Sequence, residues 1–209
     1  MIDVLSELEQ DALLEVLNLG MGQAADSLSR MVGDEVLLSV PTLYFLPRDE
    51  AFRLIEEDPH ADVAAVRQLF SGPFQGSALL IYPHDRSLEL VRSLLHAQIT
   101  PEECRTLEQE SLMEVGNIIL NACLGTLANL MEIELLCDLP QYLQGRCDLL
   151  LTEKLEMSDM THLLVLYVHF GLASNTVRGD VVLLFDATAI AEIKRELAVV
   201  LTRYACDAA

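Results

Sequence analysis

The most constraining feature of the sequence is an internal repeat, in which one pattern of a glutamate, an asparagine and a proline occurs twice. Its members are Glu15, Asn18 and Pro41 in the first copy and Glu114, Asn117 and Pro140 in the second. Every second-copy residue follows its counterpart by 99 residues, and apolar residues between them keep the same offset. Because this period is far longer than the roughly 20–50 residues of a solenoid, the repeat indicates duplication of a unit of about half the chain.

The repeated segment is predicted to begin with a long helix in each half. Apolar residues recur three and four positions apart, as in a helix with one buried face. Ser6 and Glu9 form a potential capping box at the start of the first helix. Thr100 and Pro101 are suited to the cap and first turn of the second, and Gly33 closes the first.

The remaining segments of each half predict strands and a second helix. Short apolar runs at 36–40 and 135–139 end at the paired prolines and are typical of edge strands. The expected hairpins pair 61–70 with 76–82 and 162–170 with 179–185, and the closing helices are expected at about 85–97 and 187–204. The end of the first hairpin, FQGSALLIYP, resembles that of the second, VRGDVVLLFD.

Together these segments predict an α+β fold. Two helix–strand–hairpin–helix halves would be related by a pseudo-two-fold axis around one shared sheet, because the hairpin runs are strongly apolar in both halves. We expect residues 1–209 to form a single domain, with internal repeats of about 1–99 and 100–209. No segment rich in Gly, Ser or Pro separates the repeats near residue 99.

The charge of the chain bears on its partners and location. Its 13 Lys and Arg against 33 Asp and Glu give a formal net charge of -20. A field of that sign repels nucleic-acid phosphates and anionic lipid, so we expect neither nucleic acid nor a membrane as partner. We also find no uninterrupted apolar run of the roughly 18–20 residues that a membrane span needs. Acidic residues follow Met1 where a signal segment would be basic and then apolar, so we expect a cytoplasmic protein.

The cysteines and histidines do not form a recognisable ligand pattern. The five cysteines have neither CxxC pairing nor zinc spacing, and the five histidines include no HExxH pair. We interpret the cysteines as reduced structural thiols and the histidines as structural residues.

Each predicted repeat helix carries one narrow polar stripe. The stripes consist of Asp11, Glu15, Asn18 and Gly22 in the first helix and of Glu110, Glu114, Asn117 and Asn121 in the second. At about 100° per residue, each set lies within roughly 60° on one face. Gly20 falls on the opposite face, where the absence of a side chain would permit close packing. Asn121 in place of Gly22 could make the two sites unequal.

A carboxylate and an amide one turn apart can perform two tasks on a partner. The carboxylate can pair with a cation, and the amide, both donor and acceptor, can orient a water molecule. Because asparagine is no general base at neutral pH, catalysis would come from positioning a nucleophile, as in phosphoryl transfer. A single Glu-x-x-Asn on a helix is usually a solvated face, and it is the duplication that argues for a site.

The full pattern, with Asp11 ahead of Glu15, Asn18 and Pro41, resembles the signature of the CheC, CheX and FliY phosphatases of bacterial and archaeal chemotaxis. The resemblance covers the whole chain. Its two motif copies at this length favour CheC over CheX, which carries one, and over the longer FliY. The chain departs from the pattern at Glu110, where the family usually has aspartate or serine.

The resemblance implies hydrolysis of the aspartyl phosphate of a CheY-type response regulator. Glu15 and Glu114 would pair with the regulator's active-site lysine, while Asn18 and Asn117 would enter its site and orient the attacking water. The divalent metal, Mg²⁺, would belong to the regulator, and no cofactor would be bound by this chain. CheD, a receptor-modifying deamidase, is implied as a possible second partner.

Two further hypotheses fit the same residues. The chain could be a non-catalytic adaptor that binds phosphorylated CheY, CheD or both in receptor adaptation. Alternatively, the stripes could form an interface between subunits or with the flagellar switch, in which case mutating Glu15 and Glu114 would dissociate an oligomer.

Overall fold

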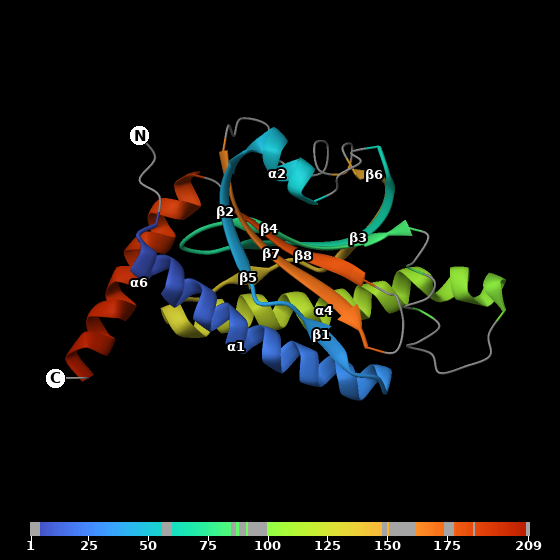
Figure 1. The fold of residues 1–209 in the computed structure, drawn as a ribbon, viewed down its shortest axis with the longest axis horizontal. Coiled ribbons are helices and arrows are strands. Elements are labelled where there is room, and N and C mark those ends of the chain that lie inside the picture. The colour runs from blue at the N-terminus through green and yellow to red at the C-terminus, as the bar shows by residue number, and fades with distance from the viewer. Residues whose placement is uncertain are drawn as a thin grey trace.

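The fold is an antiparallel sheet with long helices on one face. The computed structural model describes residues 5–55, 60–84, 87, 91, 100–147, 150, 162–173, 178–185 and 187–207. Figure 1 shows α1 (Glu7–Val32) and α4 (Pro101–Met131) side by side across one face of the sheet, with the short α2 (Arg48–Ile55) over the other. The last helix, α6 (Ala187–Asp207), lies at one end of the sheet.

The first repeat helix begins and ends where the sequence predicts. The Ser6 side chain accepts from the backbone N–H of Glu9, and the Glu9 carboxylate accepts from the Ser6 N–H at 2.6 Å, which confirms the capping box. At the other end Gly33 has a φ of 67°, a left-handed conformation that favours glycine and stops the helix.

The other helices agree with the sequence only in part. The structure confirms the second repeat helix and the closing helix of the second half, which are α4 and α6. The helix expected at 85–97 lies largely outside the described residues. The eight-residue α2 has no counterpart among the predicted elements, because it follows a strand directly with no loop signal between them.

Both predicted hairpins are present and lie at the centre of the sheet. β3 (Asp62–Ser71) pairs with β4 (Gly76–Pro83), and β7 (His162–Leu172) pairs with β8 (Arg178–Phe185). The two hairpins join through β4 and β8, where Leu79 pairs with Val182.

The outer strands cross from one half to the other. β1 (Val36–Leu38) and β2 (Thr42–Pro47) pair with β7 of the second half. Correspondingly, β5 (Leu136–Cys137) and β6 (Gln141–Arg146) pair with β3 of the first half. The sequence predicts the short strands before the prolines but not β2 and β6, which continue along the same neighbouring strand after the proline.

Equivalent residues occupy equivalent positions on the two sides of this sheet. Thr42 pairs with Tyr167 and Gln141 pairs with Arg67, so the register of β2 on β7 is repeated by β6 on β3. The sheet of eight antiparallel strands is shared by both halves around a pseudo-two-fold axis at the pairing of β4 with β8. The α+β class and the shared sheet are therefore confirmed.

Two glycines set how closely the helices pack. A Cβ on Gly20 would lie 2.5 Å from Oγ1 of Thr126 in α4, so the missing side chain lets α1 approach α4, as expected. A Cβ on Gly116 would lie 2.6 Å from Cγ1 of Val66, which brings α4 equally close to β3. The larger core cluster lies between the sheet and these helices, and a smaller one on the other face includes residues of α2.

Among the described residues, one helical stretch is long and apolar enough to cross a membrane by length and composition. This is Leu107–Met131 of α4, in which Glu108, Glu110 and Glu114 interrupt the apolar residues. Here α4 contacts α1, α6 and the sheet. Because core helices of soluble proteins pass the same test, one such helix is weak evidence for a membrane span.

Candidate functional site

The two repeated Glu/Asn pairs lie at the surface on separate helices. Glu15 and Asn18 are exposed on α1, whereas Glu114 is exposed and Asn117 half-buried on α4. Within the described part of the chain, neither glutamate forms an ion pair, so both carboxylates are available to a cation from outside. Each pair thus presents an acceptor with an amide one turn away.

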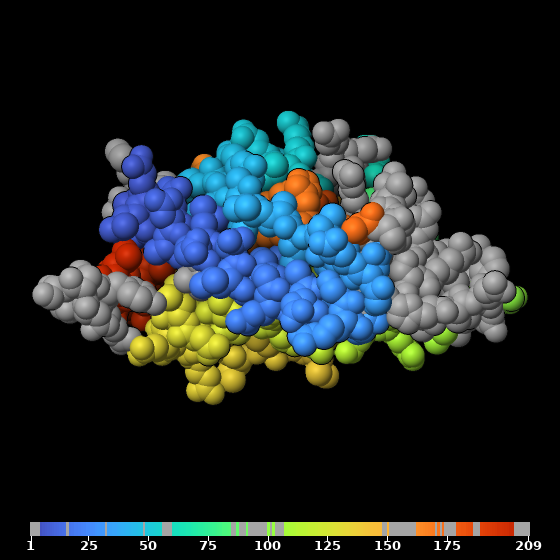
Figure 2. Space-filling model, turned by 60° about the horizontal axis from the view of Figure 1, so that its bottom comes forward, coloured from blue at the N-terminus to red at the C-terminus, as the bar shows by residue number. Residues whose placement is uncertain are grey.

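The structure does not bring the two pairs together into one centre. α1 and α4 run in opposite directions (Figure 1), with Cys123 Sγ 2.9 Å from Met21 Sδ where they cross. Asn18 precedes Met21 by three residues and Asn117 precedes Cys123 by six. At 1.5 Å per residue the two asparagines are about 14 Å apart along the helix pair. Figure 2 shows α1 with the end of α4 beside it on this face. The chain therefore presents two separate sites.

The second site continues into the protein through a series of amide hydrogen bonds. Asn121 Nδ2 donates to Asn117 Oδ1 at 2.7 Å. Gln68 of β3, only 3% exposed, donates from Nε2 to Asn121 Oδ1 at 3.2 Å and to the backbone carbonyl of Asp138 at 3.1 Å. The motif asparagine of α4 is thus linked to β3 and to the segment that precedes Pro140.

The first site has no comparable network in the described residues. Gly22 stands where α4 has Asn121, and Val168 of β7 stands where β3 has Gln68. A Cβ on Gly22 would meet nothing within 4 Å. No described side chain contacts the amide of Asn18 through a hydrogen bond. The expectation that Asn121 in place of Gly22 could make the sites unequal is therefore supported by a difference in structure.

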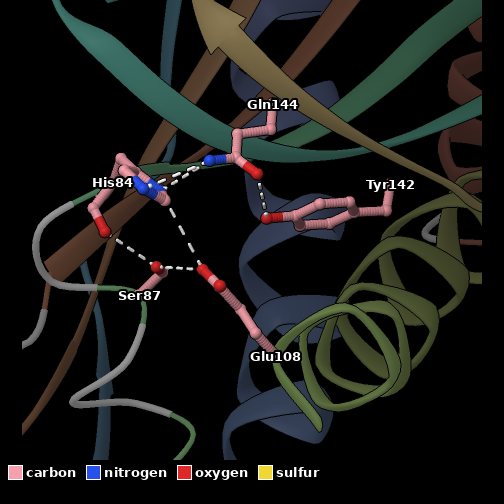
Figure 3. Close-up of polar contacts among 5 residues, drawn as sticks. All are labelled: His84, Ser87, Glu108, Tyr142 and Gln144. Carbon is pink, nitrogen blue, oxygen red and sulfur yellow. Dashed lines mark hydrogen bonds and ion pairs between the residues drawn. The ribbon is translucent and has the colours of Figure 1, made fainter. Parts of the chain in front are cut away.

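A second polar cluster fixes the beginning of α4, and sequence reasoning missed it. Figure 3 shows Glu108 of α4 between Ser87, His84, Tyr142 and Gln144. Its carboxylate bonds to the Ser87 hydroxyl and lies 4.0 Å from His84 Nδ1. Gln144 Nε2 lies 3.1 Å from the other ring nitrogen, and the Tyr142 hydroxyl donates to Gln144 Oε1 at 3.4 Å.

This cluster belongs to the packing of α4 and not to the exposed stripe. Glu108 is 7% exposed and precedes Asn117 by nine residues, which places it on the opposite side of the helix at about 100° per residue. Burial, with the negative charge and hydrogen bond of Glu108, raises the pKa of Tyr142 to about 12. No sequence signal marks Glu108, since its counterpart Glu9 is part of the capping box.

The described residues offer no metal centre. No group of three or more potential ligands among His, Cys, Asp and Glu is found in the part of the chain that the structure describes. Cys123 is buried, which raises the pKa of its thiol to about 12 and disfavours the reactive thiolate. Cys147 is also buried and Cys137 is an exposed free thiol, while Cys104 and Cys206 have no described side chains.

Comparison with known proteins identifies one family. The model of the CheC-like family matches residues 8–44, which include Glu15, Asn18 and Pro41. The CheY-P phosphatase CheC of Bacillus subtilis is 27% identical over 142 residues. That match spans 66% of this chain and 66% of the relative, just under two thirds of its length.

Solved structures of the same group share the fold. FliY of Thermotoga maritima superposes with a TM-score of 0.73 at 16% identity, over 93% of this chain and 98% of that one. CheX in the CheX–CheY–BeF3–Mg²⁺ complex from Borrelia burgdorferi matches with a TM-score of 0.54 at 17% identity, over 81% and 97%.

Proposed function

Because this chain belongs to the CheC-like family, in the CheC, CheX and FliY group of chemotaxis proteins, we propose that it is a phosphatase of a CheY-type response regulator. Its substrate would be the aspartyl phosphate of the regulator. The observation that carries this proposal is the duplicated Glu/Asn pair, exposed on two helices with both carboxylates unpaired in the described residues. The similarity to a CheY-P phosphatase supports the choice of substrate.

In the proposed reaction each helix inserts one Glu/Asn pair into the regulator's active site. Glu15 or Glu114 pairs with a lysine of the regulator, which aligns the two proteins. Asn18 or Asn117 then reaches the phosphoryl group and orients a water molecule in line with the bond that breaks. The side chains contribute position and charge, and neither asparagine takes up the proton at neutral pH.

The products follow from the bonds made and broken. The water oxygen forms a bond to phosphorus as the bond to the aspartate oxygen breaks, and the electron pair leaves with the carboxylate. Both protons of the water remain with the released inorganic phosphate. In this proposal Mg²⁺ would be bound by the regulator and would supply positive charge to the phosphoryl group, and this chain would bind no cofactor of its own.

Phosphate release from a CheY-type regulator of the same organism tests the proposal. The regulator is loaded with acetyl phosphate or by its kinase, with Mg²⁺ present, and wild type is compared with Asn18→Ala, Asn117→Ala and the double variant. We expect accelerated release that falls stepwise and disappears in the double variant. Circular dichroism and the unfolding midpoint serve as controls, since all four proteins should fold alike.

The outcomes separate this proposal from the other hypotheses. No acceleration by wild type, combined with phosphorylation-dependent binding, would favour an adaptor for phosphorylated CheY or for CheD. Dissociation of an oligomer on mutating Glu15 and Glu114 would favour a subunit or switch interface. The proposed regulator is an intracellular protein, and a cytoplasmic location for this chain is part of the proposal.

A further inference from the structure

The amide network behind Asn117 has a defined direction. The backbone carbonyl of Asp138 can only accept, so Gln68 presents Nε2 to it, and the same Nε2 donates to Asn121. Asn121 therefore offers its oxygen to Gln68 and its Nδ2 to Asn117, which accepts with Oδ1. A side-chain amide can exchange the positions of its oxygen and its NH₂ group by rotating, but a backbone carbonyl can only accept. The carbonyl of Asp138 therefore determines the orientation of all three side-chain amides.

As a result, the oxygen and the NH₂ group of the Asn117 side chain have different roles. Its Oδ1 is bound to the protein, and its NH₂ group remains free to donate to a partner. Gln68 is buried, so the network is anchored in the core and not only at the surface. Asn121 is exposed and Asn117 half-buried, but the hydrogen bonds that connect both to the buried Gln68 restrict the rotation of each side chain.

From this geometry we propose that Asn121, with Gln68, is a positioning residue that holds Asn117 with its NH₂ group toward the partner. The second site is pre-organised, whereas Asn18 in the first site loses rotational freedom only when it binds. The role assigned to Asn117 rests on the proposed function, but its orientation does not.

Pre-organisation of this kind acts on turnover more than on affinity. The exposed carboxylate of Glu114 makes the contact with the regulator in either case, so KM should change little. Holding the asparagine in place removes an entropic cost from the step in which water is oriented. If the side chain of Asn117 is no longer held in one conformation, we expect kcat to fall about three- to tenfold.

The kinetic test uses a protein in which only the second site works. In the Asn18→Ala background, Asn121→Ala is expected to lower kcat for release from the acetyl-phosphate-loaded regulator about three- to tenfold, with KM within about twofold. Alanine is the best helix former, so loss of helix stability would not account for the fall. Asn129→Ala is the matched control, because Asn129 is an exposed asparagine of the same helix outside the network.

A measurement on the protein alone tests the orientation without any regulator. The side-chain amide signals of Asn117 and Asn18 in ¹⁵N-labelled protein are assigned by their loss in the alanine variants. We expect an order parameter above about 0.8 for the Asn117 amide and below about 0.6 for Asn18. Both Asn121→Ala and Gln68→Val should lower the value of Asn117 toward that of Asn18.

The reciprocal change adds the missing residue to the first site. In the Asn117→Ala background, Gly22→Asn places an amide one turn from Asn18, where the structure leaves open space. Since the counterpart of Gln68 is absent there, we expect only about a twofold gain in kcat. Gly22→Ala is the control for the change in helix propensity.

The failures of the two proposals are distinguishable. If wild type shows no phosphatase activity, the proposed function is wrong, while the order parameters still decide whether Asn117 is held. If release is accelerated but Asn121→Ala leaves kcat unchanged, Asn121 does not position Asn117 for the reaction. Equal mobility of the Asn18 and Asn117 amides in wild type would overturn the inference on structural grounds.

Discussion

The helices α1 and α4 carry the same exposed pair but are held by different contacts. At its start α1 relies on a local capping box, in which Ser6 and Glu9 bond to each other. The beginning of α4 is instead joined to distant segments through the cluster around Glu108. In its middle α4 approaches β3 at Gly116, whereas the equivalent position in α1 is the buried side chain of Leu17.

The comparison shows that the duplication preserved the motif and the strand register but not the side chains that support the motif. The Glu/Asn pair and the proline recur at the same spacing, and the strands of the two halves keep the same register. The side chains behind each pair differ, because Asn121 and Gln68 in one half correspond to Gly22 and Val168 in the other. Two sites of the same chemistry can therefore differ in turnover, and the following predictions test whether their supports differ as described.

The largest effect is expected from placing the α1 residue into α4. Gly116→Leu would force a side chain against Val66, where even a Cβ would approach to 2.6 Å. We expect the free energy of unfolding to fall by about 2 kcal/mol, as for other overpacked core positions. Urea denaturation measures the change. Gly125→Ala is the control on the same helix, with open space around it, and it should stabilise by about 1 kcal/mol or less. A Gly116→Leu variant as stable as wild type would mean that α4 does not pack this closely on β3.

A smaller effect is expected from the cap of α1. Ser6→Ala removes the hydroxyl that accepts from the Glu9 N–H and contacts its carboxylate at 2.8 Å. The expected loss is about 1 kcal/mol in the free energy of unfolding. Ser27→Ala, an exposed serine inside the same helix, should have no such cost. If the two variants unfold at the same urea concentration, the capping box does not stabilise α1.

The smallest effect concerns the pH dependence of the cluster behind α4. Burial and Glu108 raise the pKa of Tyr142 to about 12, above the value of about 10 in an unfolded chain. The folded state therefore holds this proton more tightly, and stability falls as pH rises from about 10 to about 12. Tyr142→Phe should make that fall less steep in urea titrations. Burial also raises the pKa of Tyr82 and Cys123, so part of the fall should remain. An unchanged slope would contradict the assignment to Tyr142.

Local patterns in the sequence predict much of this fold. Capping by Ser6 and Glu9, closure at Gly33 and the two hairpins all depend on residues close together in the chain, and the structure confirms each. The strands after Pro41 and Pro140 are absent from the prediction because a proline usually ends a strand. Here the pairing is interrupted around each proline and then resumes along the same neighbouring strand.

The surroundings of the site are harder to predict than the site itself. The duplicated pair is visible because its spacing is repeated, whereas the contact of Gln68 with Asn121 joins residues 53 positions apart. Nothing in the local sequence distinguishes Gln68 from Arg67, the polar residue next to it in β3. Likewise, the contact of Glu108 with Ser87 is known only once the segment that follows β4 is placed beside α4. Which residues support an exposed pair depends on the tertiary fold.

The crossing of the outer strands has a consequence for the history of the chain. A half standing alone would keep its hairpin, but β1 and β2 would lose β7, just as β5 and β6 would lose β3. In the first half, the edges of β3 and β4 that face β6 and β8 would also be open to association with other chains. An ancestor of half this length would have satisfied those edges by pairing with a second copy of itself. Fusion of the copies would convert that obligatory dimer into one chain, whose halves can diverge in sequence but can no longer separate.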